Sequence, residues 1–374
     1  MAVFVRQLIV VSGYYGFDNL GDEAILEELV RELKSLWPAK DIVILSQNPE
    51  STAARFGVRA QNRWKLSEIA ALLRHCKLFI SGGGGLFQDS ESVKSVIYYG
   101  GLISLATLCG APTLIYAQGL GPLKSALGKA LTRFSLVQPK QISVRDETSL
   151  NLLKEWGLAN VSQRTGDPVW LLPRAELEQD LMEPIENCKR SGDKLVGLSL
   201  RDGGGFSLRH IESLAIAMHK QLSPQYRLMP LPLQANQDEK PLEQFQAIWL
   251  ELGGKLVKPN LLKIEKPSQW LSLIANLDLL VGMRLHSLIM ALSSQVPVVG
   301  ISYDPKVKHV LDYFQQPSLP YETATQVDQD AWEATLARQA KAEPQGRRII
   351  EERLATAREG ACQNQLLIAK MLSS

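Results

Sequence analysis

The chain has 374 residues, which exceeds the roughly 250–300 residues at which a single hydrophobic core stops growing, so two domains are expected. Its hydrophobic content of 45% and charged content of 21% are those of an ordinary soluble globular protein. The 41 Lys and Arg residues nearly balance the 39 Asp and Glu residues, and a chain without a net field is not expected to bind nucleic acid. Any anionic ligand must therefore be held by a local site.

The cysteines, the histidines and the N-terminus narrow the class further. The four cysteines form no C-x-x-C pair, which favours reduced thiols in a cytosolic protein. Four of the five histidines have no metal-ligand spacing to cysteines or carboxylates, so no metal site is expected. Residues 1–11 lack the long apolar region and the cleavage site of a signal peptide, and they are predicted to contain the first strand.

The first half of the chain alternates apolar strands with helices of three- and four-residue apolar spacing, which is the order of a doubly wound α/β domain. Strands are predicted at residues 7–12, 41–45, 78–81, 113–118, 141–144 and near 161, and helices at 24–37 and 148–156.

Residues 95–123 carry no charge and are long enough to cross a bilayer. The breaks at Gly100-Gly101 and at Gly110-Ala111-Pro112 divide this stretch, however, and the elements of a parallel sheet are apolar on both faces. We therefore expect a buried helix followed by a buried strand.

A segment rich in Pro, Glu and Lys separates the two halves, so residues 1–172 are predicted to form an N-terminal domain and 173–193 a linker. A second α/β domain is predicted at 194–325, with strands at 194–200, 226–231 and 261–264 and helices near 208–221 and 242–252. Residues 326–374 are predicted to form two helices, at about 328–342 and 347–372, the last of which crosses back onto the first domain.

Two regions separated by roughly 200 residues have the pattern of one repeated unit. In each, an apolar helix leads to a short buried strand, at 78–81 and at 279–282, and a further apolar helix leads through a small-X-Pro step to another buried strand. A repeat at this separation is too long for a solenoid. It predicts two similar domains that face each other.

Polar and glycine-rich clusters follow the predicted strands, and open α/β sheets bind ligands beyond the carboxyl ends of their strands. After the first strand, a flexible loop from Gly13 leads to a helix with two carboxylates in its first turn. Helix capping and ligand binding explain Glu23 equally well. Asn19 and Asp22, in their glycine-flanked turn, favour a ligand role.

Residues 81–85 read Ser-Gly-Gly-Gly-Gly, without the Lys-Ser/Thr of a phosphate loop or the spacing of a dinucleotide fingerprint. Two interpretations of Gly83 and Gly84 remain open. One is a tight turn, and the other is close approach of the backbone to a sugar or phosphate.

Three further cations follow predicted strands. Arg145 could pair with a neighbouring carboxylate, Asp146 or Glu147, or bind an anion. Arg201 precedes a glycine turn, which favours anion binding. Lys306 follows the final strand of the repeat, where it could reach a ligand or point into solvent.

Arg284 and His286 give the strongest functional signal, because they stand between an apolar strand that ends at Gly282 and an apolar helix. An arginine offers a forked, permanently charged clamp for carboxylate or phosphate. A histidine can donate or accept a proton near neutral pH. An isolated histidine is usually structural, but its pairing with an arginine at a strand end favours a catalytic site.

Several segments together resemble the polysaccharide pyruvyl transferases, and the closest resemblance is to the CsaB type. They are Gly13-x-x-Gly16-x-x-Asn19-x-Gly21-Asp22-Glu23, the Ser-Gly-Gly-Gly segment at 81, Ser143-Val144-Arg145-Asp146, Thr165-Gly166-Asp167-Pro168, Ser199-Leu200-Arg201 and Gly282-x-Arg284-x-His286-Ser287. The resemblance spans about residues 8–315.

The resemblance implies two Rossmann-like domains similar to GT-B glycosyltransferases, with the active site in the cleft between them. It implies transfer of pyruvate from phosphoenolpyruvate to a sugar as a 4,6-linked ketal, without a cofactor because phosphoenolpyruvate is a substrate. The acceptor implied by the CsaB type is a ManNAc-containing, lipid-linked precursor of a cell-wall polymer that anchors surface-layer proteins. A cytoplasmic enzyme is expected, with peripheral association at the inner membrane face left open and no oligomeric state predicted.

The resemblance also implies roles for the candidate residues. His286 is the proton donor and Arg284 the principal clamp on the donor. Phosphoenolpyruvate is expected to contact Arg284, Arg201, Arg145 and Lys306, and the acceptor sugar or phosphate to contact Gly13, Asn19, Asp22, Gly83, Gly84 and Asp167. A base for the second hydroxyl is expected from Asp18, Asp22 or Asp167.

Two other functions remain open. A GT-B glycosyltransferase would use a nucleotide sugar in place of phosphoenolpyruvate. A non-catalytic sugar- or anion-binding protein would use the same duplicated scaffold without chemistry.

Overall fold

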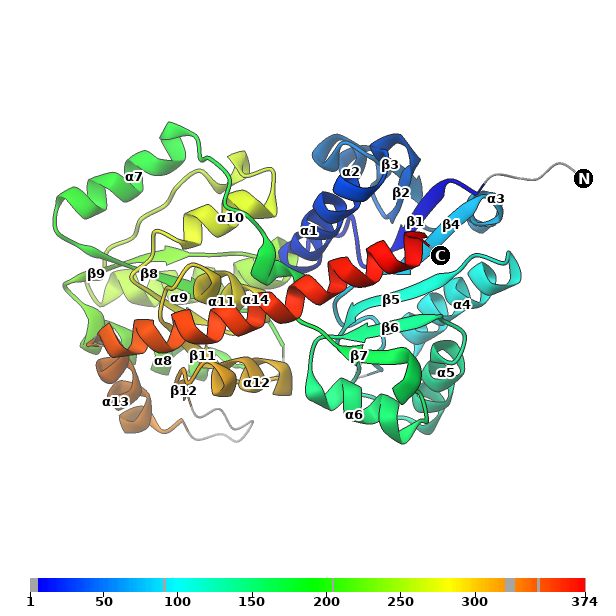
Figure 1. Cartoon of the computed structure of the whole chain (residues 1–374). Helices are drawn as coiled ribbons and strands as arrows, with labels where there is room; N and C mark the ends of the chain where they lie inside the picture. Colours follow the sequence, from blue (N-terminus) through cyan, green and yellow to red (C-terminus); the bar gives the residue numbers. More distant parts are fainter. Residues whose placement is uncertain (1–5, 90–91, 204, 320–326, 342–343, 374) are drawn as a thin grey trace, which may run out of the picture. The chain divides into compact units, whose positions relative to one another are not determined.

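A computed structural model describes residues 6–89, 92–203, 205–319, 327–341 and 344–373, and the chain divides into two compact units (Figure 1). The first unit comprises Met1–Leu172 and Ala357–Ser374, and the second comprises Pro173–Thr356. Each contains one parallel sheet. The predicted fold class, α/β with two Rossmann-like domains, is confirmed.

The first unit is built on a seven-stranded sheet in the order β3-β2-β1-β4-β5-β6-β7, and all its pairings are parallel. The strands are β1 (Leu8–Ser12), β2 (Ile42–Ser46), β3 (Arg59–Asn62), β4 (Cys76–Ser81), β5 (Thr113–Gln118), β6 (Gln141–Val144) and β7 (Ser162–Arg164). The order of strands reverses between β1 and β4. Such a reversal is where ligands bind in open α/β sheets.

The second unit contains a five-stranded parallel sheet in the order β9-β8-β10-β11-β12. Its strands are β8 (Lys194–Ser199), β9 (Tyr226–Pro230), β10 (Leu279–Gly282), β11 (Val298–Ile301) and β12 (Ser318–Leu319). Strand β10 lies between β8 and β11, as β4 lies between β1 and β5, which confirms the predicted repeat. The reversal of strand order here falls between β8 and β10.

Six helices accompany the first sheet among the described residues: α1 (Leu20–Leu36), α2 (Pro49–Phe56), α3 (Leu66–Arg74), α4 (Lys94–Leu108), α5 (Ala126–Leu136) and α6 (Glu147–Glu155). The uncharged stretch at 95–123 forms α4 and then β5, as predicted. Within the described part of the chain, no helix combines the length and the apolar character needed to span a bilayer.

The second unit contains α7 (Gln179–Arg190), α8 (Leu208–Leu222), α9 (Ala235–Glu251), α10 (Pro267–Ile274), α11 (Leu285–Ser293), α12 (Pro305–Tyr313), α13 (Gln329–Ala340) and the start of α14 (Pro344–Ser373). Residues 173–193, predicted as a linker, instead hold α7, because Leu181, Ile185 and Cys188 recur at helical spacing and are buried in the second unit. The predicted boundary at 325–326 lies outside the described residues.

Other differences from the sequence prediction have local causes. Residues 261–264 were predicted as a strand but form a short 3-10 helix, Leu261–Lys263. Strand β3 was not predicted, because its sequence Arg-Ala-Gln-Asn is polar and lies at the sheet edge. Helix α9 begins seven residues before the predicted start of 242, in a polar segment that contains Pro241.

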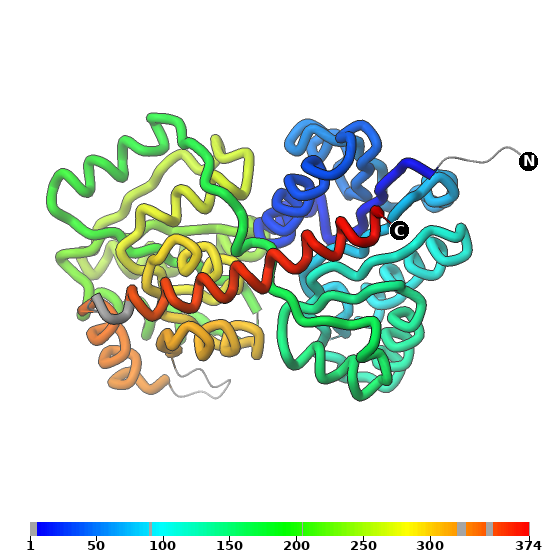
Figure 2. The backbone as a smooth tube through the Cα atoms, viewed as in Figure 1, coloured from blue at the N-terminus to red at the C-terminus, as the bar shows by residue number. Residues whose placement is uncertain are grey.

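The last helix, α14, runs as one continuous helix whose C-terminal half belongs to the first unit (Figure 2). Its fully buried Asn364 accepts hydrogen bonds from Ser143 Oγ and Thr165 Oγ1, each at 2.8 Å, and donates to the Gly166 carbonyl at 2.9 Å. Ala361 N would lie 2.7 Å from a Cβ at Gly166. Asn364 therefore joins α14 to strand β6 and to the loop that follows β7.

Replacing Asn364 with leucine should destabilise the first unit by about 2–4 kcal/mol, because it breaks three buried hydrogen bonds and leaves polar partners unsatisfied. Chemical denaturation measures this loss. Gln363→Leu is the matched control, since residue 363 is the exposed neighbour on the same helix. Equal unfolding free energies for the two variants would contradict this role of Asn364.

A second buried polar group, Glu32 of α1, is 1% exposed and accepts a hydrogen bond from Tyr116 Oη at 3.0 Å. Burial raises the pKa of Glu32 to about 8, and the neighbouring carboxylate of Glu28 adds to the rise. The folded chain therefore holds this proton up to about pH 8, whereas the unfolded chain releases it near 4.5. Stability should fall as pH rises through this window.

Glu32→Gln mimics the protonated side chain, so its unfolding free energy should match that of the wild type near pH 4.5. Above about pH 8 it should exceed the wild-type value by up to about 5 kcal/mol. Denaturation across this pH range measures the difference. The exposed Glu155→Gln should show no such widening. A constant difference for Glu32→Gln would show that Glu32 is already ionised in the folded chain.

Candidate active site

Two arginines follow the adjacent central strands of the second sheet. Arg201 stands two residues after β8 and Arg284 two residues after β10. Gly282 is in register with Ser199, and Met283 N donates to Ser199 O at 2.8 Å. Both cations therefore emerge from the carboxyl edge of this sheet, on either side of the point where strand order reverses.

Arg284 is held by the start of α9, which sequence reasoning did not connect with it. Its Nε lies 3.1 Å from Asp238 Oδ1 and its Nη2 lies 3.1 Å from Gln237 Oε1, and Nη2 also forms an ion pair with Asp238. The Asp238 side chain is fully buried, and Arg284 keeps 12% of its side chain exposed. Burial raises the pKa of Asp238, and the hydrogen bonds from Arg284 oppose that rise. The guanidinium is thus fixed in orientation from one side.

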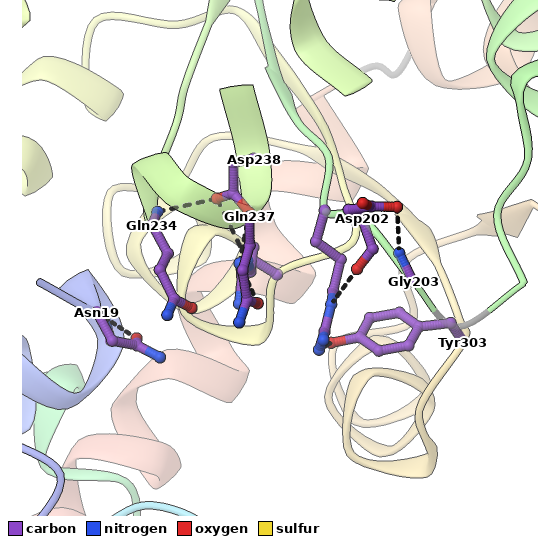
Figure 3. A network of polar contacts seen from close by, with 10 residues as sticks. Asn19, Asp202, Gly203, Gln234, Gln237, Asp238 and Tyr303 are labelled. Atoms are coloured by element: carbon purple, nitrogen blue, oxygen red, sulfur yellow. Dashed lines mark hydrogen bonds and ion pairs between the residues drawn. The ribbon is translucent and has the colours of Figure 1, made fainter. Parts of the chain in front are cut away.

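Pro241 explains how α9 is tied to the loop after β8. A proline has no N–H, so the carbonyl four residues earlier, that of Gln237, loses its helical partner. That carbonyl accepts a hydrogen bond from Asp202 N at 2.8 Å. Figure 3 shows Gln237 and Asp238 at the start of α9 and Asp202 beside Gly203 in the loop. The loop that carries Arg201 is therefore attached to the helix that orients Arg284.

Arg201 contacts the segment after β11. Its Nη1 donates to Tyr303 Oη at 3.1 Å, and its guanidinium carbon lies 5.1 Å from the centre of the Tyr303 ring. Lys306, in the first turn of α12, is partly buried, and its backbone N–H donates to Asp304 Oδ1 at 2.9 Å. The loops after β8, β10 and β11 thus carry three cations at one sheet edge.

His286 lies in the first turn of α11. Arg284 is the N-cap residue of this helix, with φ −71° and ψ 124°, and Ser287 Oγ donates to its carbonyl at 2.7 Å. His286 is partly exposed, as a proton donor to a ligand must be. Arg284 and His286 thus both stand at the start of one helix.

In the first unit, the loop after β1 and the glycine segment after β4 pack on one tyrosine. The buried Tyr15 side chain fills the space where a Cβ at either glycine would stand: its ring would lie 2.2 Å from a Cβ at Gly13, and its hydroxyl 2.1 Å from a Cβ at Gly82. Gly82 N donates to Ser12 O at 2.6 Å. Glycine is therefore required at both positions for close packing, and Gly13 lies beneath Tyr15.

Two buried serines end the same two strands. Ser12 and Ser81 are in register, and neither hydroxyl has a hydrogen-bond partner among the described residues; the same holds for the Tyr15 hydroxyl. Polar atoms left unpaired at the strand-order reversal of a sheet are consistent with a ligand site there. Burial, with a further contribution from Asp22, raises the pKa of Tyr15, so this hydroxyl keeps its proton.

The acidic residues after β1 differ in their surroundings. Asp22 Oδ1 would lie 2.7 Å from a Cβ at Gly84, whose φ of +105° also favours glycine, so the carboxylate lies directly on the glycine turn. Asn19 caps α1 by accepting from Gly21 N at 3.1 Å. The buried Glu23 accepts from Gly16 N at 2.7 Å, and burial raises its pKa to about 7.

Arg145 and Asp167, predicted to bind donor and acceptor separately, bind each other. Arg145 Nη1 lies 2.7 Å from Asp167 Oδ2, with side chains 8% and 5% exposed. Asp167 Oδ1 also accepts from Val169 N at 3.1 Å. Asp146, one of the partners proposed for Arg145, instead caps α6 through Ser149 N at 2.8 Å. The Arg145–Asp167 pair joins the ends of β6 and β7.

Arg63, just after β3, was not identified from the sequence. It is 4% exposed, donates to Gly13 O at 3.0 Å and to Tyr99 Oη at 3.2 Å, and lies 4.3 Å from the Tyr98 ring centre. The sequence did not indicate that Arg63 follows a strand, because β3 is polar and was not predicted. Arg63 supports the loop after β1 from below.

The two parallel sheets and their helices define an α/β protein of GT-B-like architecture with two Rossmann-like domains. The chain belongs to the polysaccharide pyruvyl transferase family, whose family model matches residues 19–305. Among curated protein sequences, none matches the chain significantly.

Solved structures support the fold. HepE from Anabaena, in complex with UDP and glucose, is 14% identical over 98% of this chain and 99% of its own, with a TM-score of 0.61. UDP-GlcNAc 2-epimerase from Neisseria meningitidis, bound to UDP-GlcNAc, is 13% identical over 98% and 99%, with a TM-score of 0.61. A glycosyltransferase from Rickettsia africae is 11% identical over 98% and 99%, with a TM-score of 0.58. At these identities the likeness concerns the fold alone.

Proposed function

We propose that this protein transfers the pyruvyl group of phosphoenolpyruvate to two hydroxyls of a sugar as a cyclic ketal and releases phosphate. The observation that carries the proposal is the pair of segments after β8 and β10, which bring Arg201, Arg284 and His286 to one sheet edge. Phosphoenolpyruvate carries a carboxylate and a phosphate, which suit a forked arginine and additional cations.

The chemistry requires a proton at carbon. In the proposed reaction His286 protonates the methylene carbon of phosphoenolpyruvate, which becomes the methyl group, and positive charge develops at the adjacent carbon. One sugar hydroxyl adds to that carbon and loses its proton. Phosphate then leaves with the bonding pair of its C–O bond, and the second hydroxyl closes the ketal and loses its proton. Arg284, Arg201 and Lys306 bind the anionic groups of the donor throughout.

For the acceptor we propose the loop after β1 and the glycine turn after β4, with Asp22 as the base, because its carboxylate lies on Gly84. Asp18 is 86% exposed at the side chain, and Asp167 is engaged by Arg145. Gly13, Asn19 and Gly83 shape this loop, and the Arg145–Asp167 pair supports it. A ManNAc-containing, lipid-linked acceptor and a 4,6 linkage follow from the CsaB-type resemblance.

Phosphate release tests the proposal. Purified protein should release phosphate from phosphoenolpyruvate only when a sugar acceptor is present, and mass spectrometry should show that the acceptor has gained one carboxyethylidene group, which is phosphoenolpyruvate less phosphoric acid. Free and lipid-linked sugars, with ManNAc-containing acceptors among them, form the panel. Absence of acceptor-dependent phosphate release throughout the panel would end this proposal.

The alternative is a GT-B glycosyltransferase, which the names of the solved neighbours suggest because they include UDP and UDP-GlcNAc. It predicts acceptor-dependent release of UDP from a UDP-sugar and no consumption of phosphoenolpyruvate. A sugar- or anion-binding protein would show neither reaction but would bind phosphoenolpyruvate or sugar. The same reaction panel therefore separates all three functions.

A further inference from the structure

Helices α4 and α5 lie beside each other in the first unit (Figure 1), and both carry large apolar side chains that are exposed. Ile97 and Leu108 of α4 are 55% and 85% exposed, and Leu127 and Phe134 of α5 are 57% and 63% exposed. Val137, just after α5, is 54% exposed. Single exposed apolar residues are ordinary, whereas a group of them marks an interaction surface.

Two of these side chains, Ile97 and Phe134, lie near the contact between the two helices. A Cβ at Gly100 of α4 would stand 2.2 Å from Ser135 Oγ of α5, and Gln138 Nε2 donates to Ser104 Oγ at 3.1 Å. Ile97 precedes Gly100 by about one helical turn and Phe134 precedes Gln138 by about one turn, so each lies on the side of its helix near this contact. We call Ile97, Leu108, Leu127, Phe134 and Val137 the α4–α5 face.

The charged residues of α4, α5 and the segments that adjoin them at 92–145 have one sign. Residues 92–145 contain no Asp or Glu, and the five exposed cations of this stretch are Lys94, Lys124, Lys129, Arg133 and Lys140. Within the described part of the chain, none of the five forms an ion pair. The carboxylate of Asp89 accepts hydrogen bonds from Lys124 N, Ser125 N and Ser125 Oγ, just before α5. The face is therefore apolar and cationic, although the whole chain is nearly neutral.

We propose that the α4–α5 face docks on the surface of an anionic lipid bilayer. Apolar side chains that enter the interface and cations that meet anionic headgroups are the two components of peripheral membrane binding. A second copy of the chain fits less well, because a two-fold interface would place the same cations against one another. The proposed function supplies only the reason for docking, which is that the enzyme must reach a lipid-linked acceptor.

Co-sedimentation of the full-length protein with vesicles tests the docking, without donor or acceptor. Vesicles of phosphatidylglycerol and phosphatidylcholine should bind the protein, vesicles of phosphatidylcholine alone should bind it poorly, and added salt should weaken binding. Leu127→Ser with Phe134→Ser should lower the partition coefficient at least about tenfold. Lys129→Glu with Arg133→Glu should do the same.

Matched controls come from the second unit. Leu262→Ser removes an apolar side chain that is 95% exposed, and Lys255→Glu with Lys258→Glu makes an equal charge change at two exposed lysines. Both controls should bind vesicles as the wild type does. Wild-type protein that stays in the supernatant, or α4–α5 variants that sediment like the controls, would overturn the docking. So would sedimentation velocity showing that the variants lose self-association instead.

Activity with a water-soluble acceptor keeps this result apart from the proposed function. The α4–α5 variants should retain wild-type phosphate release with that acceptor, because none of the substituted side chains belongs to the proposed site. If the wild type binds vesicles but never consumes phosphoenolpyruvate, the proposed function fails and the docking stands. If the variants lose turnover of the soluble acceptor while they remain folded, the α4–α5 face acts in catalysis and the docking is rejected.

Discussion

Replacing Arg284 with alanine should lower kcat/KM for phosphoenolpyruvate on the order of a thousandfold, because the donor loses the forked cation that binds its anionic group. Arg284→Lys keeps the charge but loses the fork and should retain intermediate activity. Steady-state phosphate release measures both. Arg209→Ala, at an exposed arginine of the same unit, should leave turnover unchanged.

The effect of Arg284→Ala on activity must be separated from its effect on folding, because Arg284 pairs with the buried Asp238. Removing Arg284 leaves Asp238 buried without its counter-charge, at a cost of about 3–5 kcal/mol of folding stability. Arg284→Met combined with Asp238→Asn removes both charges, so it should regain much of the stability but none of the activity. Recovery of activity in the double variant would mean that Arg284 only neutralises Asp238, and the donor clamp would have to be another residue.

The sequence predicted what depends on pattern. Apolar runs and helical spacing located the central strands of both sheets, and the repeat correctly aligned β4 with β10. The motifs after β1, β4, β8 and β10 were identified because parallel strands bring their carboxyl ends to one edge. The segments after β1 and β4, and those after β8 and β10, therefore fall where strand order reverses in each sheet.

The sequence did not predict which polar groups pair with one another. Asp238 and Gln237 lie 46 and 47 residues before Arg284. They belong to the first turns of α9, which were not predicted as helix because a proline, Pro241, follows them. Arg145 was assigned neighbouring carboxylates as possible partners, yet it pairs with Asp167, 22 residues away. Such pairs depend on which strands become neighbours, and residue types and spacing along the chain do not contain that information.

The buried Asp238 has a specific consequence for catalysis. A carboxylate behind Arg284 fixes the guanidinium before a donor arrives, so less conformational entropy is lost on binding. The proline that releases the Gln237 carbonyl to Asp202 extends the same rigidity to the loop of Arg201. Helix α9 thus orients Arg284 and anchors the loop that carries Arg201, although it contributes no proposed ligand of its own.

Replacing His286 with glutamine should separate binding from chemistry. If His286 protonates the donor carbon, kcat should fall by about 10²–10⁴-fold, while the Kd for phosphoenolpyruvate stays within a few-fold of the wild type because Arg284 and Arg201 remain. Single-turnover kinetics measure the first quantity and calorimetric titration the second. The exposed His309→Gln on α12 is the matched control and should behave as the wild type.

A structural role for His286 makes a different prediction. A histidine that only packs at the start of α11 would lose stability on substitution, and any loss of kcat would follow the loss of folded protein. If His286 is instead the proton donor, His286→Gln leaves the unfolding free energy nearly unchanged. The plot of kcat against pH for this variant then lacks the decline that the wild type shows at alkaline pH. Full turnover by folded His286→Gln, or a kcat profile of unchanged shape, would exclude His286 as the acid and leave Arg284 and Arg201 as a binding site that needs another proton source.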